Sequence, residues 1–330
     1  MRLLIIQPWF TAAGHPAQSL INTARTIGRE ADICYLISTQ PNFSAAELQQ
    51  KTLKEYGHVT EFPVNSPSLR EGTFKALLQL RKMAAHGSHY DHIFFLDAHL
   101  VLLALLWPFF SRDIHPKRLS MVYLMGPERV LRSKIATWLV KRFIKRSEMT
   151  LYLRTEELAK AWCDSFSPDS NCRIRHIPSL EIPDGEQIPE APAPADHLKF
   201  AVIGQVRRGK GLDWLIPMFQ KSPQLGKLTI AGTFNSADDR KAIASLSDFD
   251  GFLDKFLTED EMLQQAIQQD YLLMLYDDWD VRMESAVLYL AACANRPVIT
   301  YDKGWIGRKV RQFNCGMVAL EEQNSIESFL

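Results

Sequence analysis

One segment in the middle of the chain cannot form regular secondary structure. Residues 178–196 hold five prolines, five acidic residues and no basic residue. Proline fixes φ and lacks a backbone N–H donor, so this segment cannot be a regular helix or a central strand. Because 330 residues are enough for two domains of ordinary size, we expect a domain at 1–180, a linker at 181–197 and a second domain at 198–330.

Short apolar runs alternate with helical patterns on both sides of this linker. We expect strands at 3–7, 32–38, 93–96, 119–124, 150–153 and 174–177, and then at 200–203, 227–230, 271–276 and 297–301. Near-continuous apolar runs of this length are typical of parallel strands that are buried on both faces. The pattern therefore predicts an α/β chain of two doubly wound, Rossmann-like domains that face each other across a cleft.

Helices are expected between the strands, at 18–28, 77–86, 129–146, 211–219, 259–268 and 285–294. The longest apolar run, residues 93–110, is interrupted by Asp97, His99 and Pro108. We therefore predict a strand, a loop and a short helix there, and no membrane span. The apolar stretch at the start of the chain is too short for a signal peptide and is predicted to be the first strand.

Composition argues against several classes of protein. Apolar residues make up 46% of the chain, which supports a sizeable core and argues against disorder. The formal net charge is zero, so overall charge indicates no nucleic-acid partner. The cysteines are scattered, and they are Cys34, Cys163, Cys172, Cys293 and Cys315. Without a CxxC pair or a Cys/His cluster they indicate neither a metal site nor a disulfide framework, and a cytoplasmic location is expected.

Residues 204–211 form a strand-to-helix turn that is rich in glycine and positive charge. The turn contains three glycines together with Arg207, Arg208 and Lys210. Glycine lets the backbone approach a ligand closely, and the N-terminus of the next helix offers N–H groups and a positive dipole end. The turn therefore suits a diphosphate group, to which arginine can donate two hydrogen bonds. An exposed basic turn is the alternative, and a Walker A loop is excluded because Gly-x4-Gly-Lys-Ser/Thr is absent.

A second helix is predicted to begin at the same edge of the sheet. Glu284 or Ser285 can cap the helix at 285–294, and Asn295 suits a left-handed residue at its end. Because this helix follows the strand at 271–276, its N-terminus points at the edge that carries the basic turn. Two helix N-termini converging there would make an anion site, and an ordinary capped helix is the alternative.

The order of these elements resembles the C-terminal domain of the retaining family 4 glycosyltransferases, which have the GT-B fold. Residues 204–211 match the family pattern G-x-x-x-x-x-K-G, and residues 284–299 are similar to S-S-G-V-L-x-E-A-L-A-A-G-K-P-V-I. Leu-Thr-Glu-Asp-Glu-Met at 257–262 looks like the family's helix start v-s-x-e-e-l. The N-terminal half resembles the family only in outline.

The resemblance implies transfer of a sugar from a nucleoside-diphosphate sugar to an acceptor, with retention of configuration and without a metal or cofactor. The implied acceptor is a glycan, either lipid-linked or a precursor of a surface polysaccharide of the cell envelope. In the family the leaving phosphate itself takes the acceptor proton. On this basis the cations of the basic turn would stabilise the charge that develops on the diphosphate.

Site residues follow from the resemblance position by position. The implied donor-binding residues are Gly14, His15, Arg207, Arg208, Lys210, Phe252, Leu253, Glu284, Ser285, Ala286 and Val287, and the implied catalytic residues are Asp97, His99, Lys210 and Glu284. Lys210 would hold the diphosphate with the backbone N–H groups of Ala286 and Val287, and the loop near Phe252 would face the nucleobase. His99 would orient the reacting sugar as a hydrogen-bond donor; the alternative is a satisfied polar residue at the end of a strand.

The chain departs from the family at the donor site. The family has two glutamates eight residues apart, and the second binds the donor ribose from the helix after the loop. Those positions hold Arg282 and Leu290 here, with Glu284 two residues from the first. Leucine cannot accept a hydrogen bond from a ribose hydroxyl. A GT-B binding or regulatory protein with a degenerate donor site is therefore an alternative function, and a GT-B nucleotide-sugar epimerase is another, which would need acid/base carboxylates in the cleft.

Two further expectations concern the surface and the end of the chain. Seven lysines and arginines lie between Arg129 and Arg146, among large apolar residues. A basic helix of this kind can lie on an anionic membrane surface at the cytoplasmic face, and the alternative is a helix packed on its sheet with a solvated basic rim. Nucleic acid is disfavoured because no aromatic platform is evident. Family members continue past the stretch matched by 315–320, so a trimmed or shorter C-terminus is expected.

Overall fold

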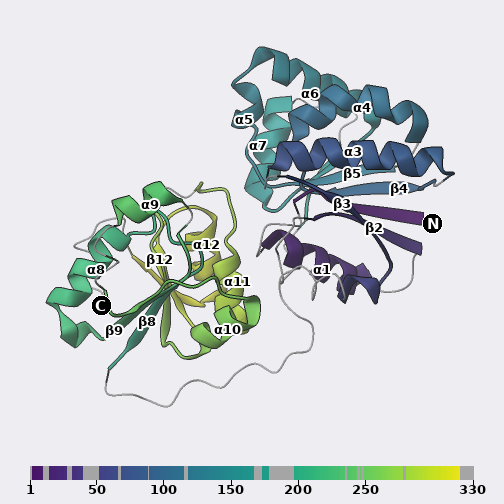
Figure 1. Cartoon of the computed structure of the whole chain (residues 1–330). Coiled ribbons are helices and arrows are strands. Elements are labelled where there is room, and N and C mark those ends of the chain that lie inside the picture. The colour runs from purple at the N-terminus through teal and green to yellow at the C-terminus, as the bar shows by residue number, and fades with distance from the viewer. Residues whose placement is uncertain are drawn as a thin grey trace. The chain divides into compact units, whose positions relative to one another are not determined.

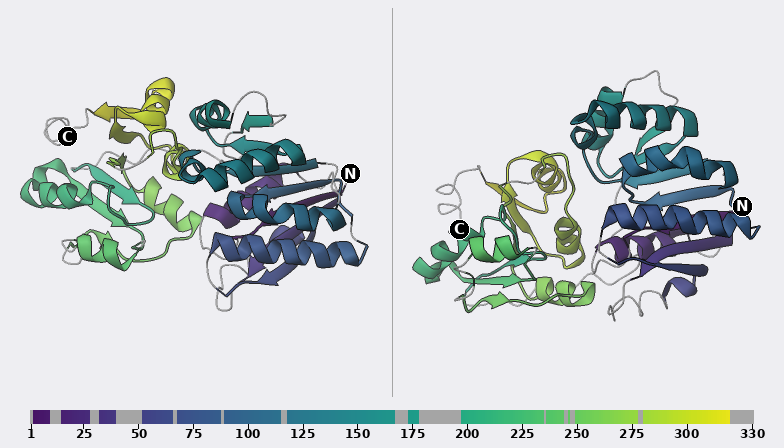
Figure 2. Two further views of the ribbon diagram at one scale, coloured as in Figure 1. Left: turned by 90° about the horizontal axis from the view of Figure 1, so that it is seen from above. Right: turned by 45° about the horizontal axis from the view of Figure 1, so that its top comes forward.

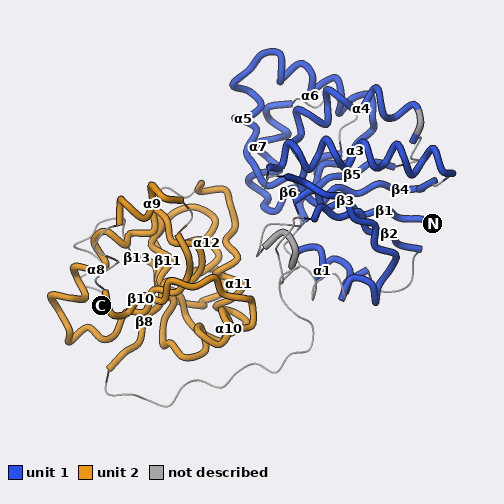
Figure 3. The backbone as a smooth tube through the Cα atoms, in the orientation of Figure 1, with its two compact units in different colours: residues 1–181 blue, residues 182–330 orange. Residues whose placement is uncertain are grey.

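The protein consists of two compact units, Met1–Glu181 and Ile182–Leu330 (Figures 1 and 3). The computed structural model describes residues 2–9, 15–27, 32–39, 52–65, 68–87, 89–114, 118–166, 173–177, 197–234, 236–243, 246, 249–277 and 280–319. Of the linker expected at 181–197, only residue 197 lies within these ranges.

Unit 1 is built on a seven-stranded parallel sheet with the order β3-β2-β1-β4-β5-β6-β7. Its strands are β1 (Arg2–Gln7), β2 (Asp32–Thr39), β3 (His58–Pro63), β4 (His92–Leu96), β5 (Arg118–Tyr123), β6 (Thr150–Leu153) and β7 (Arg173–His176). The central strands are apolar and buried, as predicted. The sequence analysis did not predict β3, because this edge strand, His-Val-Thr-Glu-Phe-Pro, buries only Phe62 and so lacks an apolar run.

The helices of unit 1 lie on both faces of this sheet. They are α1 (His15–Ile27), α3 (Leu69–Ala85), α4 (Leu100–Ile114), α5 (Glu128–Leu131), α6 (Lys134–Ser147) and α7 (Glu156–Phe166). Figure 1 shows α1 on one face and α3, α4 and α6 on the other. The right-handed crossover rule explains this division, because β1-α1-β2 runs across the sheet in the opposite direction to β3-α3-β4 and β4-α4-β5.

Two helix predictions in unit 1 need correction. The short helix expected after residue 99 is a 15-residue helix, α4, which contains Pro108. The single helix expected between Arg129 and Arg146 is two helices, α5 and α6. The chain breaks at Ser133, which is extended and accepts a hydrogen bond from the backbone N–H of Ala136 at 3.3 Å. Serine is a strong N-cap residue, so it starts a new helix there.

Unit 2 is built on a six-stranded parallel sheet with the order β10-β9-β8-β11-β12-β13. Figure 2 shows its strands and helices in two further views. Its strands are β8 (Lys199–Ile203), β9 (Lys227–Ala231), β10 (Phe252–Leu253), β11 (Tyr271–Met274), β12 (Val298–Tyr301) and β13 (Gly316–Ala319). Its helices are α8 (Leu212–Lys221), the 3-10 turn η1 (Pro223–Leu225), α9 (Ala237–Ala242), α10 (Glu259–Ile267), α11 (Ala286–Cys293) and α12 (Gly304–Phe313). The prediction of parallel α/β sheets is confirmed.

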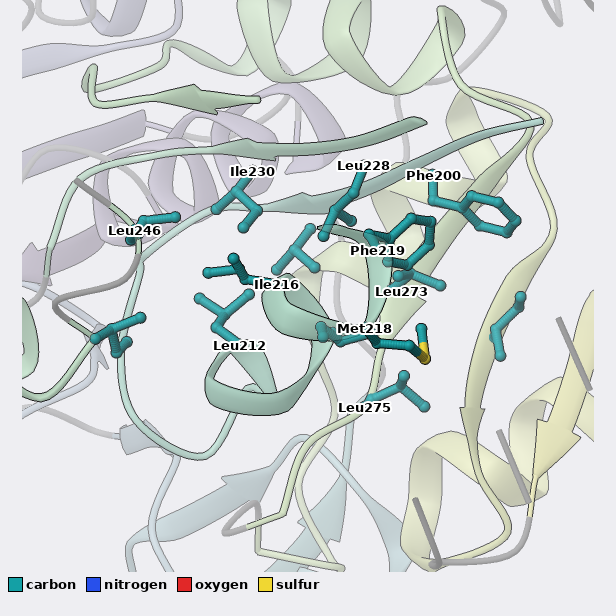
Figure 4. Close-up of a cluster of buried hydrophobic side chains, with 14 of the residues drawn as sticks. Phe200, Leu212, Ile216, Met218, Phe219, Leu228, Ile230, Leu246, Leu273 and Leu275 are labelled. Atoms are coloured by element: carbon teal, nitrogen blue, oxygen red, sulfur yellow. The ribbon is translucent and has the colours of Figure 1, made fainter. Parts of the chain in front are cut away.

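The core of unit 2 lies on both faces of its sheet. Alternate residues of β8 point to opposite faces, so Phe200 packs in one cluster and Ala201 in the other. The first cluster is closed by α8, with the rings of Phe200 and Phe219 5.4 Å apart (Figure 4). The second cluster is closed by side chains of α10, α11 and α12. The two clusters hold β8 rigidly at the centre of the unit.

Within the residues that the structure describes, no helix combines the length and apolar character that a membrane crossing requires. The cysteines in those residues, Cys34, Cys163, Cys293 and Cys315, are all free thiols.

Trp162 on α7 provides a test of the packing of unit 1. Its side chain is 0% exposed, its ring stacks on Phe166 with centroids 4.6 Å apart, and its Nε1–H donates to the carbonyl of Met125 at 2.9 Å. We expect Trp162→Ala to lower the free energy of unfolding by about 3–5 kcal/mol in urea denaturation, because it leaves a cavity. Trp138→Ala is the control, since Trp138 is 57% exposed. An equal loss in both variants would contradict this account.

Candidate functional site

The strand order reverses once in each sheet. In unit 1 the chain passes from β1 to β2 on one side and later returns to β4 on the other; in unit 2, β8 lies between β9 and β11 in the same way. Open α/β sheets bind ligands at such switch points, beyond the carboxyl ends of the strands. The loops that follow β1, β4, β8 and β11 are therefore the candidate sites.

The loop between β8 and α8 has a backbone shape that glycine favours. Gly204, Gly209 and Gly211 have φ of 92°, 75° and 69°, in the left-handed region. Gly211 is also the N-cap of α8, and a Cβ there would lie 2.9 Å from Nε1 of Trp214. Larger residues would strain this turn, so the sequence pattern of the loop matches its geometry.

Hydrogen bonds from neighbouring loops hold the same loop in place. They run from the N–H of Val206 to the carbonyl of Thr233 at 2.8 Å, from the N–H of Arg208 to Oδ1 of Asp239 at 2.9 Å, and from the N–H of Asp277 to the carbonyl of Gly209 at 2.8 Å. The last of these joins the loop directly to the chain that follows β11. The two loops of the switch point are thus one connected structure.

Lys210 turns inward from this loop. Its side chain is only 6% exposed, and Nζ donates to the carbonyl of Ile203 at 3.1 Å, at the carboxyl end of β8. Nζ also lies 5.7 Å from the centroid of the Tyr276 ring. Burial, with a smaller contribution from the nearby positive charge of Arg207, lowers the pKa of Lys210 to about 7. Arg207 is half-buried and Arg208 is exposed.

The start of α11 reaches the same place. Ser285 occupies the N-cap position, but its side chain does not cap the helix. The prediction of a side-chain cap is wrong here, because the Ser285 hydroxyl hydrogen-bonds with Tyr276 instead. The carboxylate of Glu284 accepts a hydrogen bond from the Tyr289 hydroxyl at 2.7 Å. The N–H groups of Ala286 and Val287, the first two residues of α11, have no carbonyl one turn earlier in the helix to donate to.

Tyr276 joins the two halves of this switch point. Its side chain is buried, and it lies against Lys210 from the β8 loop and hydrogen-bonds with Ser285 at the start of α11. A cation and a helix N-terminus at one strand edge form an arrangement that suits an anionic phosphate group. The sequence analysis did not single out Tyr276. Its place at the end of the apolar run at 271–276 is the signal that could have identified it.

A small pocket that is open to solvent lies beside this group of residues. It is lined by Met274, Tyr276, Val281, Thr300, Tyr301, Lys303, Gly304, Trp305 and Ile306. The pocket therefore sits beyond the carboxyl ends of β11 and β12, next to Tyr276. Its walls combine aromatic rings with one lysine.

Four more residues of unit 2 that the sequence analysis named lie in β10 or on α11. Phe252 and Leu253 form the edge strand β10 and not a loop, which corrects the sequence expectation. The ring of Phe252 packs on Phe234 with centroids 5.6 Å apart, while Leu253 is 37% exposed. Leu290 is half-buried and packs against the apolar cluster between α10 and α11. Val287 packs against the same cluster.

In unit 1, Asp97 and His99 follow β4 at the switch point. Asp97 has φ of 65°, a left-handed conformation that is uncommon outside glycine and worth a functional explanation. Its Oδ1 accepts from the N–H of Ala98 at 3.0 Å, and its own N–H donates to the carbonyl of Val122 at 3.2 Å. The turn thereby directs the chain into α4.

His99 stands immediately before α4. Its Nδ1 lies 3.3 Å from the N–H of Leu102 and accepts this hydrogen bond, so the neutral imidazole keeps its proton on Nε2. Burial and the positive charge of Arg70 lower the pKa of His99, which also favours the neutral ring. Gly14 lies outside the described residues, and the side chain of His15, the first residue of α1, is not described.

The depressed pKa of Lys210 predicts a pH-dependent stability. The unfolded chain binds this proton up to its ordinary pKa of 10.5, and the folded chain only up to about 7. Stability from this residue is therefore greatest above the unfolded pKa and is lost as the pH falls from about 10.5 to about 7. We expect Lys210→Met to raise the melting temperature at about pH 7, with a difference from the native chain that shrinks toward pH 10.5.

The matched control for this measurement is Lys221→Met, because Lys221 is an exposed lysine at the end of α8. Its difference from the native chain should stay constant over the same pH range. If the difference in melting temperature between Lys210→Met and the native chain is also constant with pH, then burial does not lower the pKa of Lys210.

Comparison with known proteins places this geometry among solved structures. No family model and no curated protein matches the chain. The structure of HepE from Anabaena in complex with UDP has a TM-score of 0.67 and 16% identity, and the match covers 100% of this chain and 88% of that one.

Two further structures are similar over most of their length. The lipopolysaccharide outer core galactosyltransferase WaaB has a TM-score of 0.56 and 11% identity, covering 94% of this chain and 83% of that one. The UDP-GlcNAc 2-epimerase of Neisseria meningitidis, bound to UDP-GlcNAc, has a TM-score of 0.52 and 13% identity, covering 100% of this chain and 90% of that one. The chain therefore has the GT-B fold, with parallel sheets of seven and six strands.

Proposed function

We propose that the protein is a glycosyltransferase that moves a sugar from a nucleoside-diphosphate sugar to a glycan or lipid-linked acceptor. The observation that carries this proposal is the buried contact of Lys210 with Tyr276, whose hydroxyl bonds with Ser285 at the switch point of unit 2. This arrangement suits a diphosphate. A GT-B structure with bound UDP, that of Anabaena HepE, matches the whole chain.

In this proposal the diphosphate of the donor lies against the β8 loop and the start of α11. Lys210 leaves the Ile203 carbonyl and pairs with the phosphate oxygens, and the negative charge raises its pKa so that it is fully protonated. Arg207 and Arg208 add charge from the same loop, and the N–H groups of Ala286 and Val287 donate from the helix N-terminus. Glu284, Phe252 and Leu253 remain candidate donor contacts.

The transfer step that we propose is the one that the resemblance to the retaining family 4 glycosyltransferases implies. The bond between the sugar C1 and the diphosphate oxygen breaks, and the acceptor hydroxyl oxygen bonds to C1 on the same face, which retains the configuration. The leaving phosphate oxygen takes the hydroxyl proton, so no metal or cofactor is required by this scheme. The cations stabilise the charge on the leaving group. The Nε2–H of His99 donates a hydrogen bond to the reacting sugar in this proposal, and Asp97, Gly14 and His15 keep the roles that the resemblance implies.

A second candidate function is a GT-B binding or regulatory protein with a degenerate donor site. The observation that favours it is Leu290, which packs against an apolar cluster and cannot accept a hydrogen bond from a ribose. A nucleotide-sugar epimerase is a third candidate, since one such enzyme has a similar fold. Interconversion of a free nucleotide sugar without an acceptor would favour the epimerase.

The first test is thermal stabilisation by a panel of nucleoside diphosphates and nucleotide sugars. A ligand that binds only the folded chain raises its melting temperature, by an amount that corresponds to about 2.7 kcal/mol at a hundredfold excess over Kd. We expect one nucleobase to give a clear rise with the native chain and none with Lys210→Ala. Lys221→Ala should behave like the native chain, because Lys221 lies at the far end of α8.

The outcomes of this test separate the candidate functions. Stabilisation together with sugar transfer to an acceptor supports the glycosyltransferase, whereas stabilisation without transfer or interconversion supports the binding protein. If no nucleotide stabilises the chain, or if Lys210→Ala retains the whole effect, the proposed donor site is wrong.

Leu290 supplies a gain-of-function test of the same site. It lies one helical turn from Ala286, the first residue of α11. If the diphosphate lies at that N-terminus, Leu290→Glu adds an acceptor for the ribose, and a hydrogen bond to a charged group stabilises by about 1.5–3 kcal/mol. We expect about tenfold tighter nucleotide binding by calorimetry or more, at some cost in melting temperature.

Leu290→Ala is the matched control for this variant, since it removes the same apolar packing without adding an acceptor. It should not tighten nucleotide binding. Equal affinities for the Glu and Ala variants would argue that the ribose is bound away from α11.

A further inference from the structure

Unit 1 carries an unusual surface on its outer helices. Among its described residues, every large apolar side chain that is exposed lies on α3, α4, α5 or α6. These residues are Phe74, Leu78, Leu105, Phe109, Leu131, Ile135 and Trp138. Helix α4 packs against both α3 and α6, and all three lie on the face of the sheet opposite α1 (Figure 1). We call the outward side of α3, α4 and α6 the outer helical face.

Helix α4 contributes the most apolar part of the outer helical face. Its inward side chains, which include Trp107 and Phe110, are buried, as expected for a helix packed on a sheet. Leu105 and Phe109, one turn apart on the other side, are 47% and 66% exposed. A helix that is apolar all round normally has an apolar environment all round. Before its last turn, α4 therefore exposes apolar side chains where a purely aqueous surface favours polar ones.

Helix α6 mixes apolar residues and cations on one stripe. Ile135 and Trp138 are 73% and 57% exposed. Lys134, Arg142 and Lys145 stand four residues before, four after and seven after Trp138, so helical spacing puts them on the same side. The guanidinium of Arg142 lies 5.4 Å from the centre of the Trp138 ring.

Helix α3 repeats the same combination. Phe74 and Leu78 are exposed one turn apart, and Arg70 and Arg81 lie on either side of them along the same stripe. In the last turn of α4, Arg112 is an exposed cation three residues after Phe109. The described side chains that are exposed on α3, α4 and α6 include lysines and arginines but no carboxylate.

We propose that the outer helical face binds the surface of an anionic lipid bilayer. Lipid phosphates complement the cations, and each lysine or arginine near such a surface contributes about 1 kcal/mol. Aromatic and aliphatic side chains between the cations enter the boundary between headgroups and acyl chains, where tryptophan is favoured. This surface extends over α3, α4 and α6, whereas the sequence analysis expected membrane contact only from the basic segment between Arg129 and Arg146. It is independent of the proposed sugar transfer.

A second copy of the chain fits this face less well. Isologous contact of the outer helical face with itself would bring the cations of α3, α4 and α6 against the same cations of the partner copy. Like charges at short range repel, and this cost opposes the apolar contact. An anionic surface has no such conflict.

The test is flotation of the full-length protein with lipid vesicles. One set of vesicles is phosphatidylcholine alone, and the other contains phosphatidylglycerol in addition. We expect binding to the anionic vesicles only, and weaker binding as salt is added, because screening reduces the attraction of exposed charges.

Charge reversal on α6 tests the cations. Arg142→Glu combined with Lys145→Glu should weaken vesicle binding by about 25-fold or more, at about fivefold for each cation lost. The matched control, Lys221→Glu with Lys241→Glu, changes the net charge equally with exposed lysines of unit 2. It should bind almost as the native chain does.

A phenylalanine pair tests the apolar contribution. Phe109 on α4 and Phe313 on α12 are both 66% exposed. Phe109→Ser should weaken binding by about tenfold or more, because burying a phenylalanine contributes about 1.5–3 kcal/mol, and Phe313→Ser should have no such effect. Circular dichroism of all variants checks that they fold.

Four results would overturn the proposal. The first is an absence of binding to anionic vesicles, and the second is binding to neutral vesicles that equals binding to anionic ones. The third is an equal loss of vesicle binding in the variants of unit 1 and in their controls in unit 2. The fourth is a dimer that forms without lipid and disappears in Phe109→Ser, which would assign the face to a second copy.

Discussion

The parallel pairing of β8 with β9 on one side and β11 on the other is the constraint on which the candidate site depends. Because all the strands are parallel, the loop after each strand lies at the same edge of the sheet, and a long crossover carries the chain back to the start of the next strand. The chain leaves β8 in one direction and β11 in the other, so their two loops meet without a helix between them. Lys210 on the first loop therefore becomes a neighbour of Tyr276 on the second, and Tyr276 in turn hydrogen-bonds with Ser285.

The buried position of Lys210 has a cost in folding stability that a bound diphosphate would offset. A buried ammonium group is costly unless it is paired. The Ile203 carbonyl and the face of the Tyr276 ring are partial partners, since neither carries a full negative charge. The diphosphate of a nucleoside-diphosphate sugar, which carries a full negative charge on each phosphate, would be a better partner. The loop glycines and the bond between Asp277 and Gly209 keep the lysine in this costly position, and such local strain is expected at functional sites.

The sequence was sufficient for the fold because apolar strand runs and glycine turns act locally. The strands predicted at 32–38, 200–203 and 271–276 correspond to β2, β8 and β11, although β11 ends at Met274. Predictions failed where tertiary partners decide. Ser285 is a residue type that caps helices, but its hydroxyl hydrogen-bonds with Tyr276 instead. Phe252 was expected in a loop, but it pairs with Ile230 and so forms an edge strand. The edge strand β3 was not predicted because only one of its residues is buried, so it has no apolar run. The burial of Lys210 could not be predicted either, because the sequence of a turn rich in cations does not indicate which cation points inward.

Helix α4 connects the two features of unit 1 that carry functional proposals. His99 caps its first turn at the switch point, and Phe109 lies ten residues along its outward side. At a rise of about 1.5 Å per residue, the two positions are about 15 Å apart along the axis. A bilayer against the outer helical face would therefore lie within reach of the loop that holds Asp97 and His99. An acceptor with a lipid anchor would meet this loop while its acyl chains stay in the bilayer, so the position of α4 is consistent with a lipid-linked acceptor for the proposed transfer.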